Sequence, residues 1–172
     1  MERGKSPIRK YWKQYKWSNI RAMMKNNKSD PKICNDDFEG RLMVITGGTS
    51  GIGYYTCRKY ASHGARILSI NRNREKSESL CDELKRDFGV QCSYMIADFS
   101  SLDDSLRVGK ELSATGDTID VLIHNAGVFL KRKELTKEGF ETTFVVNYLS
   151  SFVINYLIRE KMKAQGRGRI LM

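Results

Sequence analysis

Several residue types are scarce in this sequence, and each scarcity excludes a class of protein. There are two prolines, no low-complexity tract and no internal repeat, so a repetitive or proline-rich chain is excluded. The four cysteines lack the paired spacing of a metal site or a redox motif, and no secretory signal is recognisable. The two histidines, His63 and His124, lack partners for a metal site or a Ser/His/Asp triad. We therefore expect a single cytoplasmic domain with reduced thiols and no metal.

A membrane-spanning run is also missing. The uncharged segment FVVNYLSSFVINYLI, residues 144–158, would extend roughly 22 Å as a helix, which is short of the roughly 30 Å hydrocarbon layer. It also contains Asn147 and Asn155. The segment is therefore expected to be a buried core helix.

Acidic residues are scarce at the N-terminal end. Residues 1–32 hold ten Lys and Arg against Glu2 and Asp30, a balance of +8 in a chain whose net charge is +10. We interpret residues 1–39 as a basic extension with interleaved aromatic side chains. Ile8, Trp12 and Tyr15 would share one face of a short helix within it.

Three interpretations of this basic extension stay open. It could contact an anionic membrane surface through residues 1–32, which would make the protein a peripheral membrane protein. It could contact nucleic acid through lysines and aromatic stacking, which is the least favoured of the three. It could also be a solvated arm or pack on its own domain, as most charged segments do.

From Gly40 onward, short apolar runs alternate with helical patterns. Residues 40–172 are expected to form one doubly wound, Rossmann-like α/β domain, because strands that alternate with long helices form a parallel sheet. Ligands of such sheets bind beyond the carboxyl ends of the strands. The predicted strands cover residues 42–46, 65–70, 91–97, 120–124 and 169–172. The predicted helices cover residues 52–63 and 74–88, a segment capped by Ser100 or Ser101, and a long segment from Thr136 to about Lys163.

The sequence TGGTSGIG, from Thr46 to Gly53, joins the first strand to the first helix of this domain. Gly47 and Gly48 are expected to adopt backbone angles that other residues resist. Gly51 would let the chain approach a pyrophosphate, and Gly53 would let the helix pack on the sheet. The helix N-terminus would then present N–H groups and a positive dipole end to phosphate. The alternative is a tight turn with no ligand.

This loop resembles that of the short-chain dehydrogenase/reductase family, and three further motifs strengthen the resemblance. His124-Asn125-Ala126-Gly127 resembles the family's N-N-A-G, and Asp98-Phe99-Ser100 stands where the family has an adenine-contacting Asp. Asn147 stands where the family places a helix Asn in its proton relay. Residues 131–141 resemble the retinol-dehydrogenase-like branch, including a subgroup with a basic N-terminal extension. The resemblance covers residues 40–172, which would be the N-terminal, cofactor-binding half of such a protein.

The resemblance implies a role for each matching residue. Asn147 would be the one member of the catalytic set in this chain, and His124 would be a strand-end residue beside the cofactor. The residues expected to bind the cofactor are Gly47, Thr49, Ser50, Gly51, Ile52 and Gly53 at the pyrophosphate, Asp98 and Phe99 at the adenine, and Asn125, Ala126 and Gly127 at the ribose and nicotinamide.

The end of the second strand favours NADP(H) over NAD(H). No acidic residue that could bind a ribose 2′-hydroxyl precedes Glu75. Arg72, helped by Asn71, would instead pair with a 2′-phosphate. The alternative is that Arg72 and Arg74 merely begin a solvated helix.

The chain stops at Met172, where the family's catalytic Ser and Tyr-x-x-x-Lys would be expected to follow. Tyr55 and Lys59 have the Tyr-x-x-x-Lys spacing, but they lie in the first helix and are expected to be an exposed helix face. We therefore expect the complete protein to be an NADP(H)-dependent oxidoreductase acting on a lipophilic carbonyl compound or secondary alcohol. The alternative is a truncated, non-catalytic nucleotide-binding module. An uncovered long helix, with Phe152 and Tyr156 exposed, and an open fifth strand would favour homo-oligomers.

Overall fold

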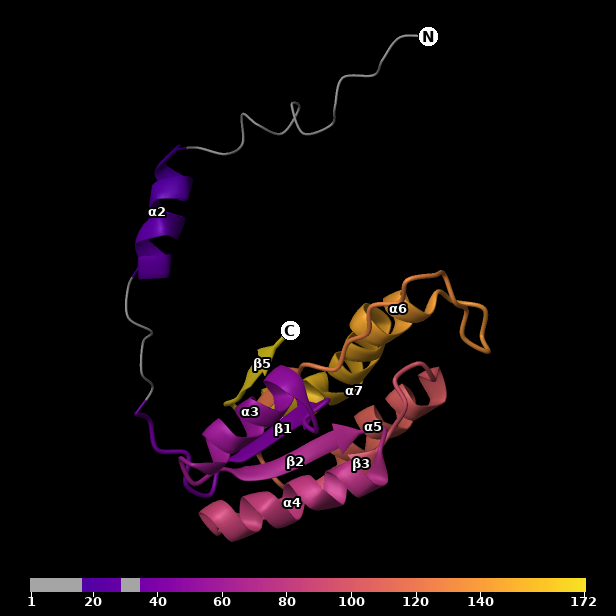
Figure 1. Cartoon of the computed structure of the whole chain (residues 1–172). Helices are drawn as coiled ribbons and strands as arrows, with labels where there is room; N and C mark the ends of the chain where they lie inside the picture. The colour runs from indigo at the N-terminus through magenta and orange to yellow at the C-terminus, as the bar shows by residue number, and fades with distance from the viewer. Residues whose placement is uncertain (1–16, 29–34) are drawn as a thin grey trace. The chain divides into compact units, whose positions relative to one another are not determined.

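The computed structural model describes residues 17–28 and 35–172, and the chain divides into two units after Asn35. In the first unit, helix α2 spans Trp17–Lys28 (Figure 1). The sequence patterns did not predict this helix. The predicted face of Ile8, Trp12 and Tyr15 lies outside the described residues. The second unit, Asp36–Met172, contains the sheet and the other described helices.

The second unit is built on a parallel five-stranded sheet with the strand order β3-β2-β1-β4-β5. This is the predicted Rossmann-like arrangement, and the predicted strand positions agree with it to within one residue. Its strands are β1 (Leu42–Thr46), β2 (Arg66–Asn71), β3 (Cys92–Ile96), β4 (Ile119–His124) and β5 (Arg169–Leu171). Its helices are α3 (Gly51–Ala61), α4 (Arg74–Phe88), α5 (Leu102–Ala114), α6 (Thr142–Phe144), the π-helix η2 (Val145–Leu149) and α7 (Ser150–Ala164).

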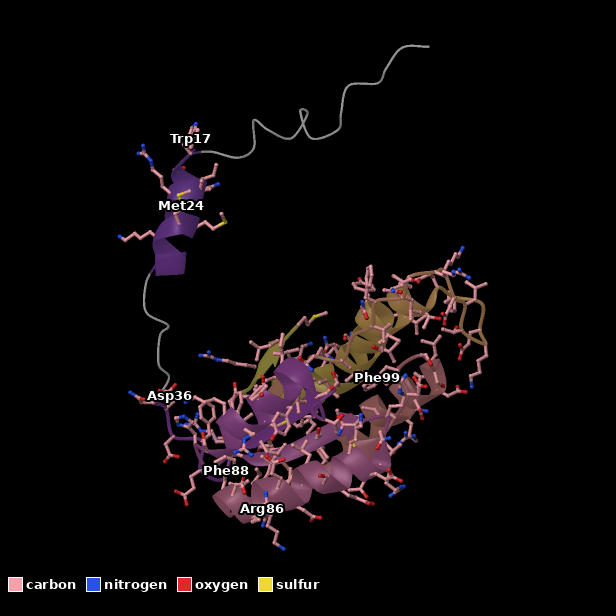
Figure 2. All side chains as sticks on the ribbon, in the orientation of Figure 1. Trp17, Met24, Asp36, Arg86, Phe88 and Phe99 are labelled. Carbon is pink, nitrogen blue, oxygen red and sulfur yellow. The ribbon has the colours of Figure 1, made fainter. Side chains whose placement is uncertain are left out.

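Helices cover both faces of the sheet. All of β1 is buried, and its alternate side chains enter two different cores. Met43 and Ile45 pack with residues of α3 and α4, whereas Val44 packs with residues of α5 and α7. Figure 2 shows the side chains of both layers, including Phe88 of the α3–α4 core and Phe99 of the opposite one. Burial on both faces explains why β1 is an almost continuously apolar run.

The helix ends follow the predicted signals in two places. Ser101 caps α5 by accepting a hydrogen bond from the Asp104 N–H at 3.4 Å, and Asp103 and Asp104 occupy its first turn. Asn73 caps α4 by accepting from the Lys76 N–H at 2.8 Å, and Gly89 ends that helix with φ 70°. The two side-chain caps satisfy backbone N–H groups that have no partner within their own helix.

The predicted start of the long helix at Thr136 is wrong. Residues 136–139 form a turn, with Gly139 at φ 84° and its N–H bonded to the Thr136 carbonyl at 2.9 Å. The helical segment begins at Thr142 instead, because Glu141 caps it by accepting from the Phe144 N–H at 2.6 Å. An antiparallel bridge between Leu135 and Glu141 closes the intervening loop.

The long helical segment α6–η2–α7 exposes four aromatic side chains, which we call the aromatic ladder: Phe144, Tyr148, Phe152 and Tyr156. Their exposed fractions are 47, 52, 53 and 58%. Phe144 stacks on Tyr148 with ring centroids 5.5 Å apart, and Tyr148 on Phe152 at 6.5 Å. Strand β5 forms one edge of the sheet, and its side chains are exposed. The expected exposure of Phe152, Tyr156 and β5 is therefore confirmed. The expectation that residues 144–158 form a buried core helix is wrong for this aromatic face, because burial is confined to the face that carries Val145, Val146, Ile154 and Ile158.

Candidate functional site

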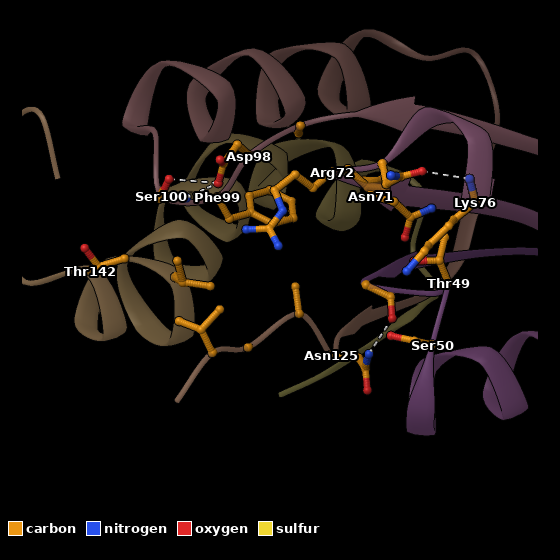
Figure 3. Close-up of a pocket in the computed structure, with 18 of the residues that line it drawn as sticks. Thr49, Ser50, Asn71, Arg72, Lys76, Asp98, Phe99, Ser100, Asn125 and Thr142 are labelled. Carbon is orange, nitrogen blue, oxygen red and sulfur yellow. Dashed lines mark hydrogen bonds between the residues drawn. The ribbon is translucent and has the colours of Figure 1, made fainter. Parts of the chain in front are cut away.

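A cavity of about 640 Å³ opens at the carboxyl ends of β1, β2, β3 and β4 (Figure 3). Sequence order reverses between β1 and β4, so this is the switch point at which doubly wound sheets bind ligands. Eleven of the predicted cofactor-binding residues line the cavity: Gly47, Thr49, Ser50, Ile52, Asn71, Arg72, Asp98, Phe99, Asn125, Ala126 and Gly127.

The glycine-rich turn forms one wall of the cavity. Gly47 has φ 72° and Gly51 has φ 54°, which is the left-handed region that favours glycine. A Cβ atom on Gly53 would lie 2.1 Å from the Gly47 carbonyl oxygen and 2.5 Å from Asn125 Nδ2. Gly51 and Gly53 do not line the cavity themselves, but they set the path of the turn and the start of α3.

Gly48 is required for a different reason from the expected one. It has no positive φ, but a Cβ atom there would lie 2.3 Å from Ser69 Oγ and 2.9 Å from Cys57 Sγ. Close packing between the turn and β2, not unusual backbone angles, therefore excludes a side chain at this position.

Thr46 and Asn125 tie the turn after β1 to the turn after β4. The buried Thr46 Oγ1 accepts hydrogen bonds from the N–H groups of Asn125 and Ala126, each at 3.0 Å. Asn125 Nδ2 donates to the carbonyl oxygens of Thr46 at 3.2 Å and Gly47 at 2.9 Å. These bonds hold two walls of the cavity in a fixed relation, with no ligand required.

The end of β2 differs in one respect from the sequence-based expectation. Asn71 is buried and its amide is turned inward, where Oδ1 accepts from the Gly48 N–H at 2.8 Å and Nδ2 donates to Ser69 Oγ at 2.9 Å. Asn71 therefore braces the glycine-rich turn, and its side chain is not free to help Arg72 hold a phosphate.

Lys76 is a lining residue that the sequence patterns missed. It lies in the first turn of α4, four positions after Arg72, and both side chains are exposed at the cavity (Figure 3). The four-residue spacing between Arg72 and Lys76 was the signal that could have identified Lys76. The same spacing of cations is also typical of a helix start that faces solvent. Two cations thus stand at the β2 side of the cavity, whereas its acidic residues, Asp98 and Glu134, come from other elements.

Asp98 and Phe99 form the wall beyond β3. Asp98 Oδ1 accepts from the N–H of Ser100 at 2.9 Å and from its hydroxyl at 2.8 Å. The Asp98 N–H donates to Asp104 Oδ2 at 2.7 Å. Burial alone would raise the pKa of Asp104, but this N–H and the Arg107 guanidinium hold it below its ordinary value. The carboxylate of Asp104 therefore stays charged and fixes the backbone of this wall.

Asn147 and His124, the last residue of β4, lie outside the cavity lining. Asn147, in η2, accepts from the Val128 N–H at 2.8 Å and donates to the Val128 carbonyl at 2.9 Å. His124 was expected beside the cofactor, but its Nε2 lies 2.8 Å from Asn155 Oδ1 of α7. Burial lowers the pKa of His124, an effect that the Asn155 hydrogen bond opposes. His124 thus joins β4 to α7 and does not contact the cavity.

Tyr55 and Lys59 do not reach the cavity either. Tyr55 lies on α3 with 71% of its surface exposed, and Lys59 is exposed on the same helix. Neither lines the cavity, as expected for an exposed helix face. In residues 17–28 and 35–172, no group of three or more His, Cys, Asp and Glu side chains is arranged to hold a metal ion.

The fold and the cavity define an α/β domain with a dinucleotide-type site. The family model described as short chain dehydrogenase matches residues 41–172. The chain therefore belongs to the short-chain dehydrogenase/reductase family, and its relatives place it in the retinol-dehydrogenase-like branch.

Two relatives and one solved structure illustrate the match. Human retinol dehydrogenase 12 is 35% identical over 140 residues, which cover 80% of this chain and 44% of that protein. The WW domain-containing oxidoreductase of Drosophila melanogaster is 38% identical over 121 residues, which cover 69% of this chain and 30% of that protein. A short-chain dehydrogenase from Sphingobium yanoikuyae in complex with NADPH superimposes with a TM-score of 0.68 at 25% identity, covering 76% of this chain and 51% of that one. The chain thus spans less than half the length of these two relatives.

Proposed function

We propose that this chain forms the NADP(H)-binding half of an oxidoreductase. The complete protein would transfer hydride between the nicotinamide and a lipophilic carbonyl compound or secondary alcohol. The observation that carries this proposal is the pair of cations, Arg72 and Lys76, at the end of β2 in a cavity that also contains the glycine-rich turn. Relatives named as a retinol dehydrogenase and an oxidoreductase support the reaction class.

The N-terminus of α3 would hold the pyrophosphate. The first N–H groups of a helix have no partner within that helix, and the helix dipole attracts anions. In α3 these groups belong to Gly51, Ile52 and Gly53, and the Ser50 side chain makes no capping hydrogen bond. Thr49 and Ser50 would add hydroxyl donors from the cavity wall.

Arg72 and Lys76 would hold the 2′-phosphate that distinguishes NADP(H) from NAD(H). The guanidinium can form two parallel hydrogen bonds to a phosphate, and the ammonium adds a second positive charge. No carboxylate follows β2 before Glu75. The NADPH complex of the Sphingobium relative supports this choice of cofactor.

The remaining walls would hold the other parts of the cofactor. Asp98 and Phe99 would frame the adenine, and Asn125, Ala126 and Gly127 would line the ribose and nicotinamide. We place Asn147 in the proton relay by its family position. Both polar atoms of its side chain already bond to Val128, so the side chain would support the relay indirectly, by holding the loop after β4 in place.

The test is calorimetric titration of the chain with NADPH and, separately, with NADH. Charge-assisted hydrogen bonds contribute about 1.5–3 kcal/mol each, so Arg72→Gln and Lys76→Gln should each weaken NADPH binding at least about tenfold. NADH binding should change little in either variant. Lys85→Gln, which removes an exposed cation from the far end of α4, is the matched control. Equal loss of both cofactors, or no loss of NADPH, would refute the assignment.

A second candidate function is a nucleotide-binding module that performs no turnover by itself. It is favoured by one observation: residues of this chain line the whole described cavity, whereas Tyr55 and Lys59, the pair with the Tyr-x-x-x-Lys spacing, lie outside it. NADPH oxidation with a panel of lipophilic ketones and aldehydes distinguishes the two functions. Binding without oxidation supports the module, and oxidation by the 172-residue chain excludes it.

A further inference from the structure

Helix α2 carries an exposed apolar stripe. Trp17, Ile20 and Met24 recur at i, i+3 and i+7, which places them on one face of the helix. Because an α-helix turns by about 100° per residue, Met23 lies next to this face. Trp17 is 76% exposed, and Met23 and Met24 are each 59% exposed. We call these four residues the apolar stripe.

Positive charge accompanies the apolar stripe. On a helical wheel, Arg21 and Lys25 follow one edge of the stripe, and both side chains are exposed. The helix contains no Asp or Glu. It lies within residues 1–32, whose charge balance is +8. An apolar stripe bordered by cations is the pattern of a helix that lies in the interface of a membrane.

We propose that α2 binds the surface of an anionic lipid bilayer, with the apolar stripe in the acyl-chain boundary and Arg21 and Lys25 among the headgroups. Its 12 residues extend about 18 Å, too short to cross a hydrocarbon layer of about 30 Å. None of the helices in the described parts of the chain is long and apolar enough to span a membrane. The helix would therefore lie parallel to the surface.

The composition of the apolar stripe favours lipid over nucleic acid. Binding to single strands depends on aromatic rings that stack on bases, together with cations that follow the backbone. Within α2, Trp17 is the one aromatic side chain, and Ile20, Met23 and Met24 offer neither a ring nor a strong hydrogen-bonding group. Burial in the acyl-chain layer of a membrane would remove the apolar surface of all four side chains from water, which is energetically favourable.

The test is flotation of the full 172-residue chain with two kinds of vesicle. One kind is phosphatidylcholine alone, and the other contains roughly a third phosphatidylserine, a common anionic lipid of cytoplasmic leaflets. We expect flotation with the anionic vesicles and at least tenfold weaker binding to the neutral ones. Raising the ionic strength from about 0.15 M to about 1 M should weaken binding, because the Debye length falls from about 8 Å to about 3 Å.

Matched variants separate the contribution of the cations from that of the apolar stripe. Arg21→Gln with Lys25→Gln should weaken binding to anionic vesicles about thirtyfold, whereas Lys59→Gln with Lys110→Gln removes the same charge from exposed sites on the other unit and should have little effect. Trp17→Ala with Met24→Ala should also abolish flotation. Alanine favours helix, so that loss would not reflect unfolding of α2. Ser18→Ala with Asn19→Ala, on the polar side, is the control for the stripe.

Tryptophan fluorescence gives an independent readout. Trp12 and Trp17 are the two tryptophans of the chain, so a Trp12→Phe variant reports on Trp17 alone. Anionic vesicles should shift its emission to shorter wavelength as the ring leaves water. Absence of flotation and of this shift overturns the proposal. It is also overturned if single-stranded DNA binds more tightly than the vesicles, or if the two sets of control variants lose as much binding as the test variants.

Discussion

At the scale of single residues, His124 occupies the last position of β4 and bonds to Asn155 of α7. Burial lowers its pKa below the ordinary value of about 6.5, so the folded state resists protonation more than the unfolded state does. At low pH the unfolded state therefore binds the extra proton. The free energy of unfolding should fall as pH drops through about 6.5 towards the lowered pKa of the folded state.

Urea titrations at several pH values measure this dependence. The His124→Asn substitution keeps a polar side chain at the end of β4 but removes the titrating imidazole. The free energy of unfolding should therefore change less steeply between pH 7 and pH 5 than in the wild type. An unchanged slope in His124→Asn would show that His124 titrates equally in both states.

At the scale of elements, Asn147 of η2 fastens the loop after β4 through two hydrogen bonds to Val128. An intramolecular hydrogen bond contributes about 0.5–1.5 kcal/mol, so Asn147→Ala should lower the free energy of unfolding by about 1–3 kcal/mol. Amide hydrogen exchange should accelerate in the loop that follows Val128 and much less in α4, on the opposite face of the sheet. Equal acceleration in both places would instead indicate global unfolding.

Much of this element order could be predicted from the sequence, because its signals are local. Gly64 and Gly89 mark the ends of helices, and the apolar runs are too short for anything but buried strands. The start of the long helix could not be predicted in this way. Thr136 and Glu141 both suit a helix N-terminus, and the choice depends on the turn at Gly139 and the bridge between Leu135 and Glu141.

The candidate site was predictable to a similar degree. Motifs identified eleven of the cavity-lining residues, because these lie at the carboxyl ends of β1, β2, β3 and β4 or in the segments that directly follow them. The direction of a side chain was not predictable: Asn71 points into the protein because Gly48 and Ser69 offer it partners there. Lys76 reaches the cavity because Asn73 caps α4 and fixes its first turn. Both outcomes depend on contacts between elements.

At the scale of the whole molecule, the aromatic ladder is a large apolar surface without a cover in the described structure. Such surfaces tend to associate. We predict that the chain forms homo-oligomers, and that Phe152→Ser with Tyr156→Ser raises the dissociation constant at least about tenfold, because buried aromatic anchors contribute more than about 1 kcal/mol each. Light scattering over a range of concentrations measures this change.

The control for this prediction is Phe129→Ser. Phe129 is more exposed than any ladder residue, at 91%, but it lies in the loop after β4. This substitution should leave the oligomeric state unchanged. A wild-type chain that remains a monomer at every concentration would refute the role of the ladder.

The hydrogen bond between Thr46 and Asn125 joins positions that are 79 residues apart. During synthesis at about 5–20 residues per second, Asn125 leaves the ribosome roughly 4–16 s after Thr46. Strand β1 pairs with β2 on one side and with β4 on the other. During those seconds the side of β1 that pairs with β4 has no partner. A chaperone that binds extended apolar segments could retain the chain in this interval.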